Sequence, residues 1–239
     1  MISFVIPAYN ESKNIKQTVE QIVNSCISLN INEFEILIID DNSNDDTENT
    51  VHQVVNIYPK VNLIFHKNNI NIGFGGSVIR GLKLAKYPNV LWLPGDNSHS
   101  SSEINKVLSE KEGHDIVSTY YTNAHERTAG RRIFTKFYTP FLNMIYGLNV
   151  PYYNGFSLIS KRIINQINIK TNAHCWQVEL WVKAKYIKNF NYKFVPTILK
   201  DRINSTNAFK LKNSIKVIYT IFRLFFLNFY LLIKSKFFN

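Results

Sequence analysis

The chain has few cysteines and few acidic residues. Its 239 residues include only 2 cysteines, Cys26 and Cys175, and 17 Asp plus Glu against 28 Lys plus Arg. Two cysteines outside a CxxC spacing exclude a disulfide framework and fit a reducing compartment. The chain also begins directly with an apolar segment at residues 2–6, without a basic region or a cleavage site. We therefore expect no export signal and a cytosolic setting.

The shortage of acids leaves a formal net charge of +11. Such an excess favours an anionic partner, which could be nucleic acid, a membrane surface or a phosphorylated substrate. Lysines scattered for solubility would give the same total, so the position of the basic residues has to decide. Hydrophobic residues make up 45% of the chain, which excludes disorder throughout.

Short apolar runs alternate with segments of helical periodicity. Buried strands are predicted at residues 3–6, 35–39, 62–65, 90–93 and 116–119, and a further strand is predicted at 194–199. Helices are predicted at residues 15–26, 77–85 and 102–110, along a stretch ending at Tyr146, at 161–167 and 174–188, and after Lys210. This alternation predicts an α/β fold with a mostly parallel sheet flanked by helices. Ligands of such sheets bind beyond the carboxyl ends of the strands, so the polar loops there form the candidate site.

The first two strands end in loops suited to a nucleotide. After the first come Pro7, Ala8, Tyr9, Asn10 and Glu11, and Tyr9 offers a flat face for a base. The second ends at two adjacent acids, Asp40 and Asp41, which can accept hydrogen bonds from a base and a ribose. Asp45 or Asp46 can cap the following helix. An EF-hand is excluded because Asp45 stands at its glycine position and Val51 at its final glutamate position.

The third predicted strand leads to a turn with three glycines, Gly73, Gly75 and Gly76. Val78 occupies the position of the third glycine in a dinucleotide fingerprint, and no Gly-Lys-Ser/Thr follows, so neither phosphate-binding motif fits. The turn opens a helix that carries Arg80, and its N–H groups suit either a phosphate or a close backbone approach.

The fourth predicted strand ends in Pro94-Gly95-Asp96-Asn97-Ser98-His99. A carboxylate at this position can hold Mg²⁺ or Mn²⁺ together with a diphosphate, since Mg²⁺ needs only one or two protein carboxylates beside substrate phosphates. An aspartate in an ordinary turn is the alternative interpretation.

These loops resemble glycosyltransferase family 2, whose members have the Rossmann-like GT-A fold and transfer a sugar from a nucleoside diphosphate with inversion. The resemblance rests on residues 5–11, on Asp40-Asp41-Asn42-Ser43 with Thr47, and on residues 71–85. It implies that the UDP- or GDP-sugar is held by Pro7, Ala8, Tyr9, Glu11, Asp40, Asp41, Gly73, Gly75, Gly76 and Arg80. It also places Asp96 at the metal. Pro94 stands where the family usually has a first acid, so Asp96 would bind the metal alone or with Asn97 or His99 through water.

Looser blocks in the second half resemble the polyprenyl-phosphate hexosyltransferases of this family. They are Tyr153-Asn154-Gly155-Phe156, Lys161-Arg162, Val195-Pro196 and Asp201-Arg202. A lipid phosphate is already ionised and needs cations to place it, which we expect from Arg127, Arg131, Arg132, Arg202 and Lys210. A sugar hydroxyl would instead need a base, for which Glu179 is the candidate. We therefore take Asp96, Glu179 and Arg202 as the candidate catalytic residues, with a solvated helix face as the alternative for Glu179.

The end of the chain is predicted to be a basic, aromatic helix. We divide the chain into a catalytic domain at residues 1–210 and a membrane-associating helix at residues 211–239. Arg223 and Asn228 interrupt its apolar sequence. A central arginine costs about 2.5–3.5 kcal/mol on insertion scales, so a helix lying on the membrane is preferred to a spanning or re-entrant one. Packing against another protein is the third interpretation.

The predicted function is transfer of a hexose to a lipid-linked acceptor at the cytoplasmic face of an anionic membrane. The acceptor is either polyprenyl phosphate or the hydroxyl of a lipid-linked glycan. An inactive nucleotide-sugar-binding scaffold is the alternative of another class, because the first metal acid is missing. Nucleic acid is not expected as a partner, since no aromatic RNA-binding motif is present.

Overall fold

One mixed sheet of seven strands organises the residues that the computed structural model describes, 1–123, 129–198 and 211–237. Its strand order is β3-β2-β1-β4-β6-β5-β7. The strands are β1 (Ile2–Ala8), β2 (Phe34–Asp40), β3 (Asn62–Lys67), β4 (Asn89–Trp92), β5 (Ile116–Tyr121), β6 (Ser157–Ser160) and β7 (Tyr192–Thr197). The helices are α1 (Ile15–Ser28), α2 (Thr47–Ile57), α3 (Phe74–Leu84), α4 (Ser101–Ser109), α5 (Ala129–Tyr146), α6 (Lys161–Gln166), α7 (Trp176–Ala184) and α8 (Leu211–Phe237).

Strands β1 to β4 pair in parallel, as the alternating sequence pattern predicts. The strand β6 was not expected; it is antiparallel to both of its neighbours, β4 and β5. It begins just after Gly155, where an added Cβ would lie 1.9 Å from the carbonyl oxygen of Thr119. The missing side chain therefore lets the backbone before β6 approach β5, a requirement that a four-residue apolar run does not reveal.

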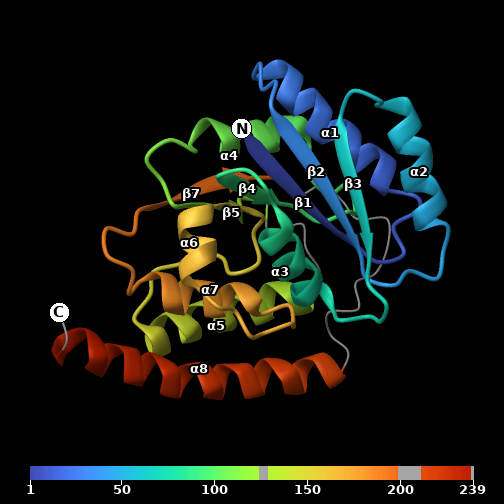
Figure 1. Cartoon of the computed structure of the whole chain (residues 1–239). Coiled ribbons are helices and arrows are strands. Elements are labelled where there is room, and N and C mark those ends of the chain that lie inside the picture. The colour runs from blue at the N-terminus through green and yellow to red at the C-terminus, as the bar shows by residue number, and fades with distance from the viewer. Residues whose placement is uncertain (124–128, 199–210, 238–239) are drawn as a thin grey trace.

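Helices cover both faces of the sheet (Figure 1). Val5 and Ile6 point to opposite faces because side chains alternate along a strand. Val5 lies under Gly81 of α3, whereas Ile6 and Ile15 of α1 both approach Gly95. Figure 1 shows α1, α2 and α4 together on one side and α3, α6 and α7 on the other. The expectation that residues 62–65 form a buried strand is wrong, because β3 is an edge strand and its side chains are half-buried.

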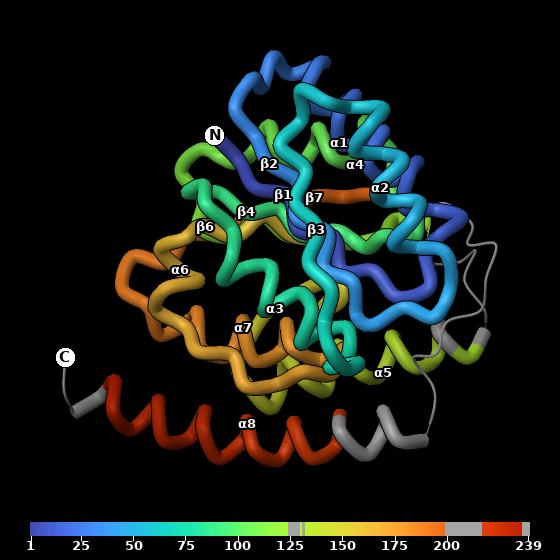
Figure 2. The backbone as a smooth tube through the Cα atoms, turned by 45° about the vertical axis from the view of Figure 1, so that its right-hand side comes forward, coloured from blue at the N-terminus to red at the C-terminus, as the bar shows by residue number. Residues whose placement is uncertain are grey.

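The long helix α8 runs along the outside of the helical layer formed by α5 and α7 (Figures 1 and 2). The hydroxyl of Tyr146 at the end of α5 donates to the carbonyl oxygen of Ile221 at 2.9 Å. The hydroxyl of Tyr186 donates to the side-chain oxygen of Asn228 at 2.9 Å. By length and composition, the segment Val217–Ser235 within α8 is apolar enough to cross a membrane.

Candidate active site at the carboxyl ends of the strands

The loops after β1 and β2 are joined by hydrogen bonds between backbone and side chains. The N–H of Asn10 donates to the hydroxyl of Ser43 at 2.9 Å, and the N–H of Glu11 donates to the hydroxyl of Thr47 at 2.9 Å. Ser43 in turn donates its hydroxyl and its N–H to the buried carboxylate of Asp40. The two loops therefore form one rigid unit, as expected for parallel strands that end at the same edge.

Tyr9 projects from this unit toward solvent. Pro7 and Ala8 before it are buried and lie in register with Ile39 and Asp40 of β2. The side chain of Tyr9 remains 40% exposed. An exposed aromatic ring one residue after Ala8, the register partner of Asp40, can stack on a base, and the roles of Tyr9 and Asp40 in holding a nucleotide stay predictions.

Asp41 forms hydrogen bonds with the backbone of the glycine turn. Its buried carboxylate accepts the backbone N–H of Ile72 at 2.8 Å, the N–H of Gly73 at 2.9 Å and the side-chain amide of Asn68 at 2.9 Å. Gly73 has a φ of +86°, a conformation that glycine adopts without strain. Asp41 thus fixes the backbone that leads into α3.

The segment before α7 packs against the other side of this turn. A Cβ added to Gly75 would lie 2.4 Å from the carbonyl oxygen of Ala173. The N–H of Gly76 donates to the carbonyl oxygen of Asn172 at 3.3 Å. Of the two uses expected for these glycines, the structure shows the close backbone approach, because protein acceptors already bind the N–H groups of Gly73 and Gly76.

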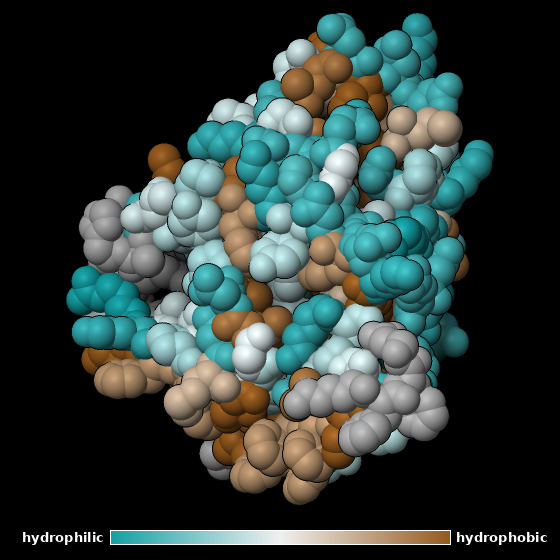
Figure 3. Space-filling view, turned by 90° about the vertical axis from the view of Figure 1, so that its left-hand side faces the viewer, coloured by the Kyte–Doolittle hydropathy of each residue, from teal (hydrophilic) through white to brown (hydrophobic). Residues whose placement is uncertain are grey.

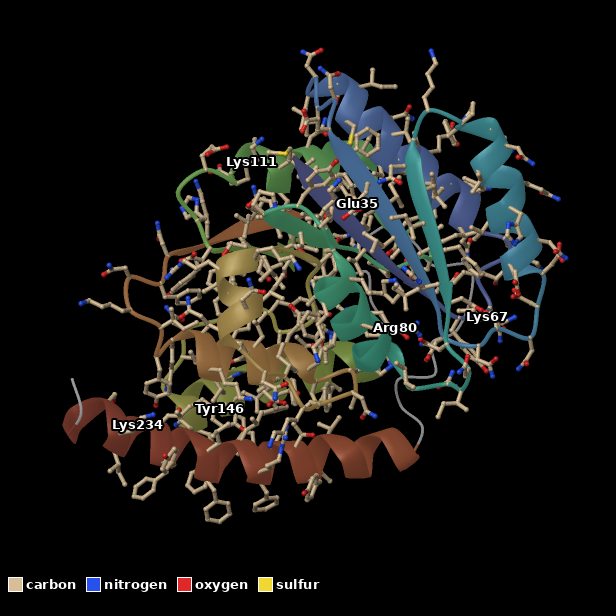
Figure 4. The ribbon with its side chains drawn as sticks, viewed as in Figure 1. Glu35, Lys67, Arg80, Lys111, Tyr146 and Lys234 are labelled. Carbon is tan, nitrogen blue, oxygen red and sulfur yellow. The ribbon has the colours of Figure 1, made fainter. Side chains whose placement is uncertain are left out.

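Arg80 lies on α3 beside the end of β3, near Lys67 (Figure 4). Its guanidinium donates to the side-chain oxygen of Asn68 and, at 3.5 Å, to the carbonyl oxygen of Lys67. Asn68 therefore links Arg80 to the carboxylate of Asp41, so the predicted cation stands at the same edge as the predicted acids.

Asp96 follows β4 in a loop that is tied to α1. The hydroxyl of Thr18 donates to the carbonyl oxygen of Gly95 at 3.0 Å and accepts the N–H of Asn97 at 3.0 Å. The carboxylate of Asp96 accepts the N–H and the hydroxyl of Ser98 at 3.1 and 2.5 Å. Gly95 also approaches the carbonyl oxygen of Pro7, which places this loop next to the loop of Tyr9.

The donor set at Asp96 is compatible with one kind of cation site. Among the described residues no group of three or more His, Cys, Asp or Glu is placed to hold a metal ion. A Mg²⁺ or Mn²⁺ ion at this loop would therefore take one oriented carboxylate from the protein and most of its ligands from a diphosphate and water, which Mg²⁺ accepts. The ring of His99 is buried against the rings of Phe156 and Tyr121, at centroid distances of 4.4 and 6.1 Å.

Glu179 is buried inside α7, so the alternative of a solvated helix face is wrong. Its carboxylate forms ion pairs with Lys183 at 2.6 Å and with Arg223 of α8 at 2.6 Å. It also accepts the N–H and hydroxyl of Thr171 at 2.9 and 2.6 Å and the N–H of Lys170 at 3.2 Å. Burial would raise the pKa of Glu179, but the hydrogen bonds from Lys183 and Thr171 outweigh it and the pKa lies below its usual value.

The cations expected at an acceptor phosphate are described only in part. Arg127, Arg202 and Lys210 lie outside the described residues. Arg131 falls in α5, and Arg132 is exposed on the same helix. Trp176 and Trp181 are core residues, packed against Trp92 and Phe194 respectively.

The arrangement of these loops agrees with a comparison of sequences. A profile described as Glycosyl transferase family 2 matches residues 3–167. The chain belongs to glycosyltransferase family 2. The family predicted from the loop motifs is therefore confirmed.

Two curated relatives of this glycosyltransferase are named undecaprenyl-phosphate 4-deoxy-4-formamido-L-arabinose transferase. The protein from Proteus mirabilis (strain HI4320) is 30% identical over 137 residues, which is 55% of this chain and 41% of the relative. The protein from Pseudomonas savastanoi pv. phaseolicola (strain 1448A / Race 6) is 29% identical over 134 residues, 55% of this chain and 38% of the relative. The glycosyltransferase thus matches about two fifths of the length of each.

Solved structures confirm the GT-A fold. Glucosyl-3-phosphoglycerate synthase from Mycobacterium tuberculosis, in complex with Mn²⁺, UDP and phosphoglyceric acid, superposes with a TM-score of 0.72 at 18% identity, covering 94% of this chain and 78% of that one. A mannosyltransferase from Pyrobaculum calidifontis, in complex with GDP-Man and Mn²⁺, gives a TM-score of 0.64 at 12% identity, covering 86% and 58%. Both of these solved structures contain Mn²⁺.

Three residues that the sequence analysis did not assign to the site form hydrogen bonds with its predicted members. Asn68 links Asp41 to Arg80, and its position directly after β3 was an available signal. Thr171 and Arg223 both bind Glu179. The lone arginine inside an apolar helix hinted at an ion pair, but nothing in the sequence identified Glu179 as its partner.

Proposed function

We propose that this glycosyltransferase moves a sugar, with inversion, from a nucleoside-diphosphate sugar to polyprenyl phosphate. The observation that carries the choice of acceptor is the state of Glu179. A hydroxyl acceptor needs a base that is free to take its proton. The carboxylate of Glu179 is buried, bound by Lys183 and Arg223, and has a lowered pKa, all of which disfavour proton abstraction.

A phosphate acceptor does not need that base. It is already ionised near neutral pH and requires only cations that hold it in line with the donor. Arg131 and Arg132 on α5, with Arg127, Arg202 and Lys210, are the proposed cations. The names of the curated relatives, which contain undecaprenyl phosphate, support this choice of acceptor.

The proposed donor site is the edge formed by Pro7, Ala8, Tyr9, Glu11, Asp40 and Arg80. In this proposal Tyr9 stacks on the base and Asp40 binds the nucleoside. Asp96 would hold Mg²⁺ or Mn²⁺, which would offset the charge of the diphosphate. Asp41, Gly73, Gly75 and Gly76 shape the turn, and Glu179 acts as a positioning residue. Asp41 and Glu179 each bind backbone N–H groups of neighbouring segments, and the glycines pack against Asn172 and Ala173.

We also propose that the protein works at the cytoplasmic face of a membrane, with α8 lying on the surface. The two polar residues that interrupt the apolar sequence of α8 both face the protein, Arg223 toward Glu179 and Asn228 toward Tyr186. A helix fixed to its own domain at two polar positions supports a lying rather than a spanning arrangement.

The test is a donor screen on the purified full chain. UDP- and GDP-sugars, both hexoses and pentoses because the relatives are named for an arabinose derivative, are incubated with short-chain polyprenyl phosphate and Mg²⁺ or Mn²⁺. Released nucleotide and the lipid product are measured, and the matched control is the same polyprenol without its phosphate. We expect a product with the phosphate alone and none with EDTA or with Asp96→Asn.

Two results would contradict the proposal. Transfer to the hydroxyl of a lipid-linked glycan, with polyprenyl phosphate inert, would favour the alternative acceptor. Donor binding measured by titration calorimetry, without transfer or hydrolysis under any condition, would favour the inactive scaffold that the missing first acid suggested.

A further inference from the structure

The helix α5 carries an exposed apolar stripe that the site does not use. Its members recur at helical spacing along one side, and they are Ile133, Phe134, Phe137, Phe141 and Met144. Phe137 and Met144 are 68% and 76% exposed. The opposite side of the helix is packed into the domain through Leu142 and Tyr146, so α5 is amphipathic and, within the described part of the chain, its apolar stripe remains exposed.

A second stripe lies on the neighbouring helix α8. Its exposed members are Ile218, Tyr219, Phe222, Phe225, Phe226, Phe229, Tyr230, Leu232 and Ile233. Arg223 and Asn228 point inward, so between residues 217 and 233 the outer face carries no charge. The two helices lie side by side, and Figure 3 shows hydrophobic side chains gathered at the lower end of the molecule, where α8 lies.

The charge of these helices is of one sign. The sequences Ala129–Tyr146 and Leu211–Phe237 contain no Asp or Glu. Their basic residues are Arg131, Arg132, Lys136, Lys212, Lys216, Arg223, Lys234 and Lys236. Exposed aromatic rings bordered by cations suit the boundary of an anionic bilayer, where rings enter between lipids and cations meet the headgroups. Two copies of the same basic surface would repel each other, which argues against a homodimer as the occupant.

We infer that α5 and α8 together form one docking surface for an anionic lipid bilayer, so that the protein contacts the membrane through two helices and not through the C-terminal helix alone. The inference deepens the proposed function and rests on it for the lipid acceptor. In Figure 1 the carboxyl ends of β1, β2 and β3 point toward the beginning of α8. Docking through this surface would therefore bring the donor-binding edge close to the headgroups.

The test measures sedimentation of the full chain with vesicles that contain neither acceptor nor donor. Vesicles of equal parts phosphatidylglycerol and phosphatidylcholine are compared with phosphatidylcholine alone. The α5 variant is Phe137→Ser with Met144→Ser. The matched control is Ile27→Ser with Ile57→Ser, on α1 and α2 at the far side of the molecule, which likewise replaces two apolar side chains, 69% and 48% exposed, by serine.

We expect the α5 variant to bind anionic vesicles about tenfold more weakly than wild type, because two large apolar side chains no longer enter the bilayer. The control should bind like wild type, and wild type should bind phosphatidylcholine about tenfold more weakly than the anionic vesicles. Unchanged circular dichroism of each variant separates these effects from misfolding. Wild-type binding by the α5 variant, or a dimer in light scattering that Phe137→Ser dissociates, would overturn the inference.

Turnover separates this inference from the proposed function. The α5 variant should keep transfer to polyprenyl phosphate in detergent micelles and lose it in vesicles. If no format gives transfer but vesicle binding depends on Phe137 and Met144 as stated, the acceptor proposal fails and the docking surface stands. If the variant loses transfer equally in micelles and vesicles while its vesicle binding is normal, the docking surface is wrong.

Discussion

The glycine turn before α3 is held from two sides by two buried carboxylates that work differently. Below it, Asp41 binds neutral donors, the N–H groups of Ile72 and Gly73 and the amide of Asn68. On the other side, Glu179 binds the segment of Thr171 and forms ion pairs with two cations, Lys183 and, on α8, Arg223. Asp41 thus binds only groups of its own neighbouring loops, whereas Glu179 links the proposed donor edge to the proposed membrane helix.

Replacement of Glu179 should give the largest effect. Glu179→Gln keeps the shape of the side chain but leaves Lys183 and Arg223 without their counter-charge. Breaking a buried ion pair costs about 3–5 kcal/mol, and we expect the lower end because both cations are partly exposed. The free energy of unfolding in urea measures the loss.

The control for this prediction is Glu110→Gln, which breaks the pair of Glu110 with Lys193 at the surface. Since both side chains are well exposed, this loss should stay near or below about 1 kcal/mol. Equal losses for Glu179→Gln and Glu110→Gln would mean that the Glu179 network has no special structural role. Glu179 would then be available again as a base.

An added side chain at Gly75 should give the next largest effect on stability. Gly75→Ala would place a Cβ 2.4 Å from the backbone oxygen of Ala173, which has to move. Such overpacking costs about 1–3 kcal/mol, and because it displaces the turn it should also weaken binding of the nucleotide sugar. Titration calorimetry with the donor and urea unfolding measure the two effects.

Gly76→Ala is the matched control one residue later. The three atoms nearest to its Cβ would be side-chain carbons of Ile72, the closest at 3.0 Å, and these can shift. Alanine is favoured over glycine in a helix by up to about 1 kcal/mol, so the net change should be small. If Gly76→Ala weakens donor binding as much as Gly75→Ala, contact with the segment at Ala173 is not what requires glycine.

The contrast between the two carboxylates also explains what the sequence could predict. Asp40, Asp41 and the glycine turn follow successive parallel strands, so their convergence follows from strand order alone. Glu179 meets Arg223 across 44 residues and through the packing of α8, which no local pattern encodes. The same holds for β6, whose position depends on the approach of Gly155 to β5.

A smaller loss of stability is expected when Asp41, which binds neutral donors, is replaced. Asp41→Asn keeps one acceptor oxygen but turns the other into a donor facing an N–H group. One buried hydrogen bond lost in this way costs about 1–3 kcal/mol, near the low end here because neighbouring bonds remain. The Michaelis constant for the donor should rise more than the turnover number falls. A fall in turnover at unchanged Michaelis constant would instead place Asp41 in contact with the reacting groups.

The smallest effect is a dependence of the unfolding free energy on pH that comes from Glu179. The pKa of Glu179 is lowered because hydrogen bonds from Lys183 and Thr171 outweigh burial. Its contribution to stability is therefore fully present above the ordinary glutamate pKa of about 4.3 and is lost as pH falls through the lower folded pKa. The gap in unfolding free energy between wild type and Glu179→Gln should accordingly be constant from neutral pH to about pH 5 and narrow below it. A gap that widens in acid would mean that Glu179 is protonated in the folded protein, and the ion pairs with Lys183 and Arg223 could not then hold α8 to the donor edge.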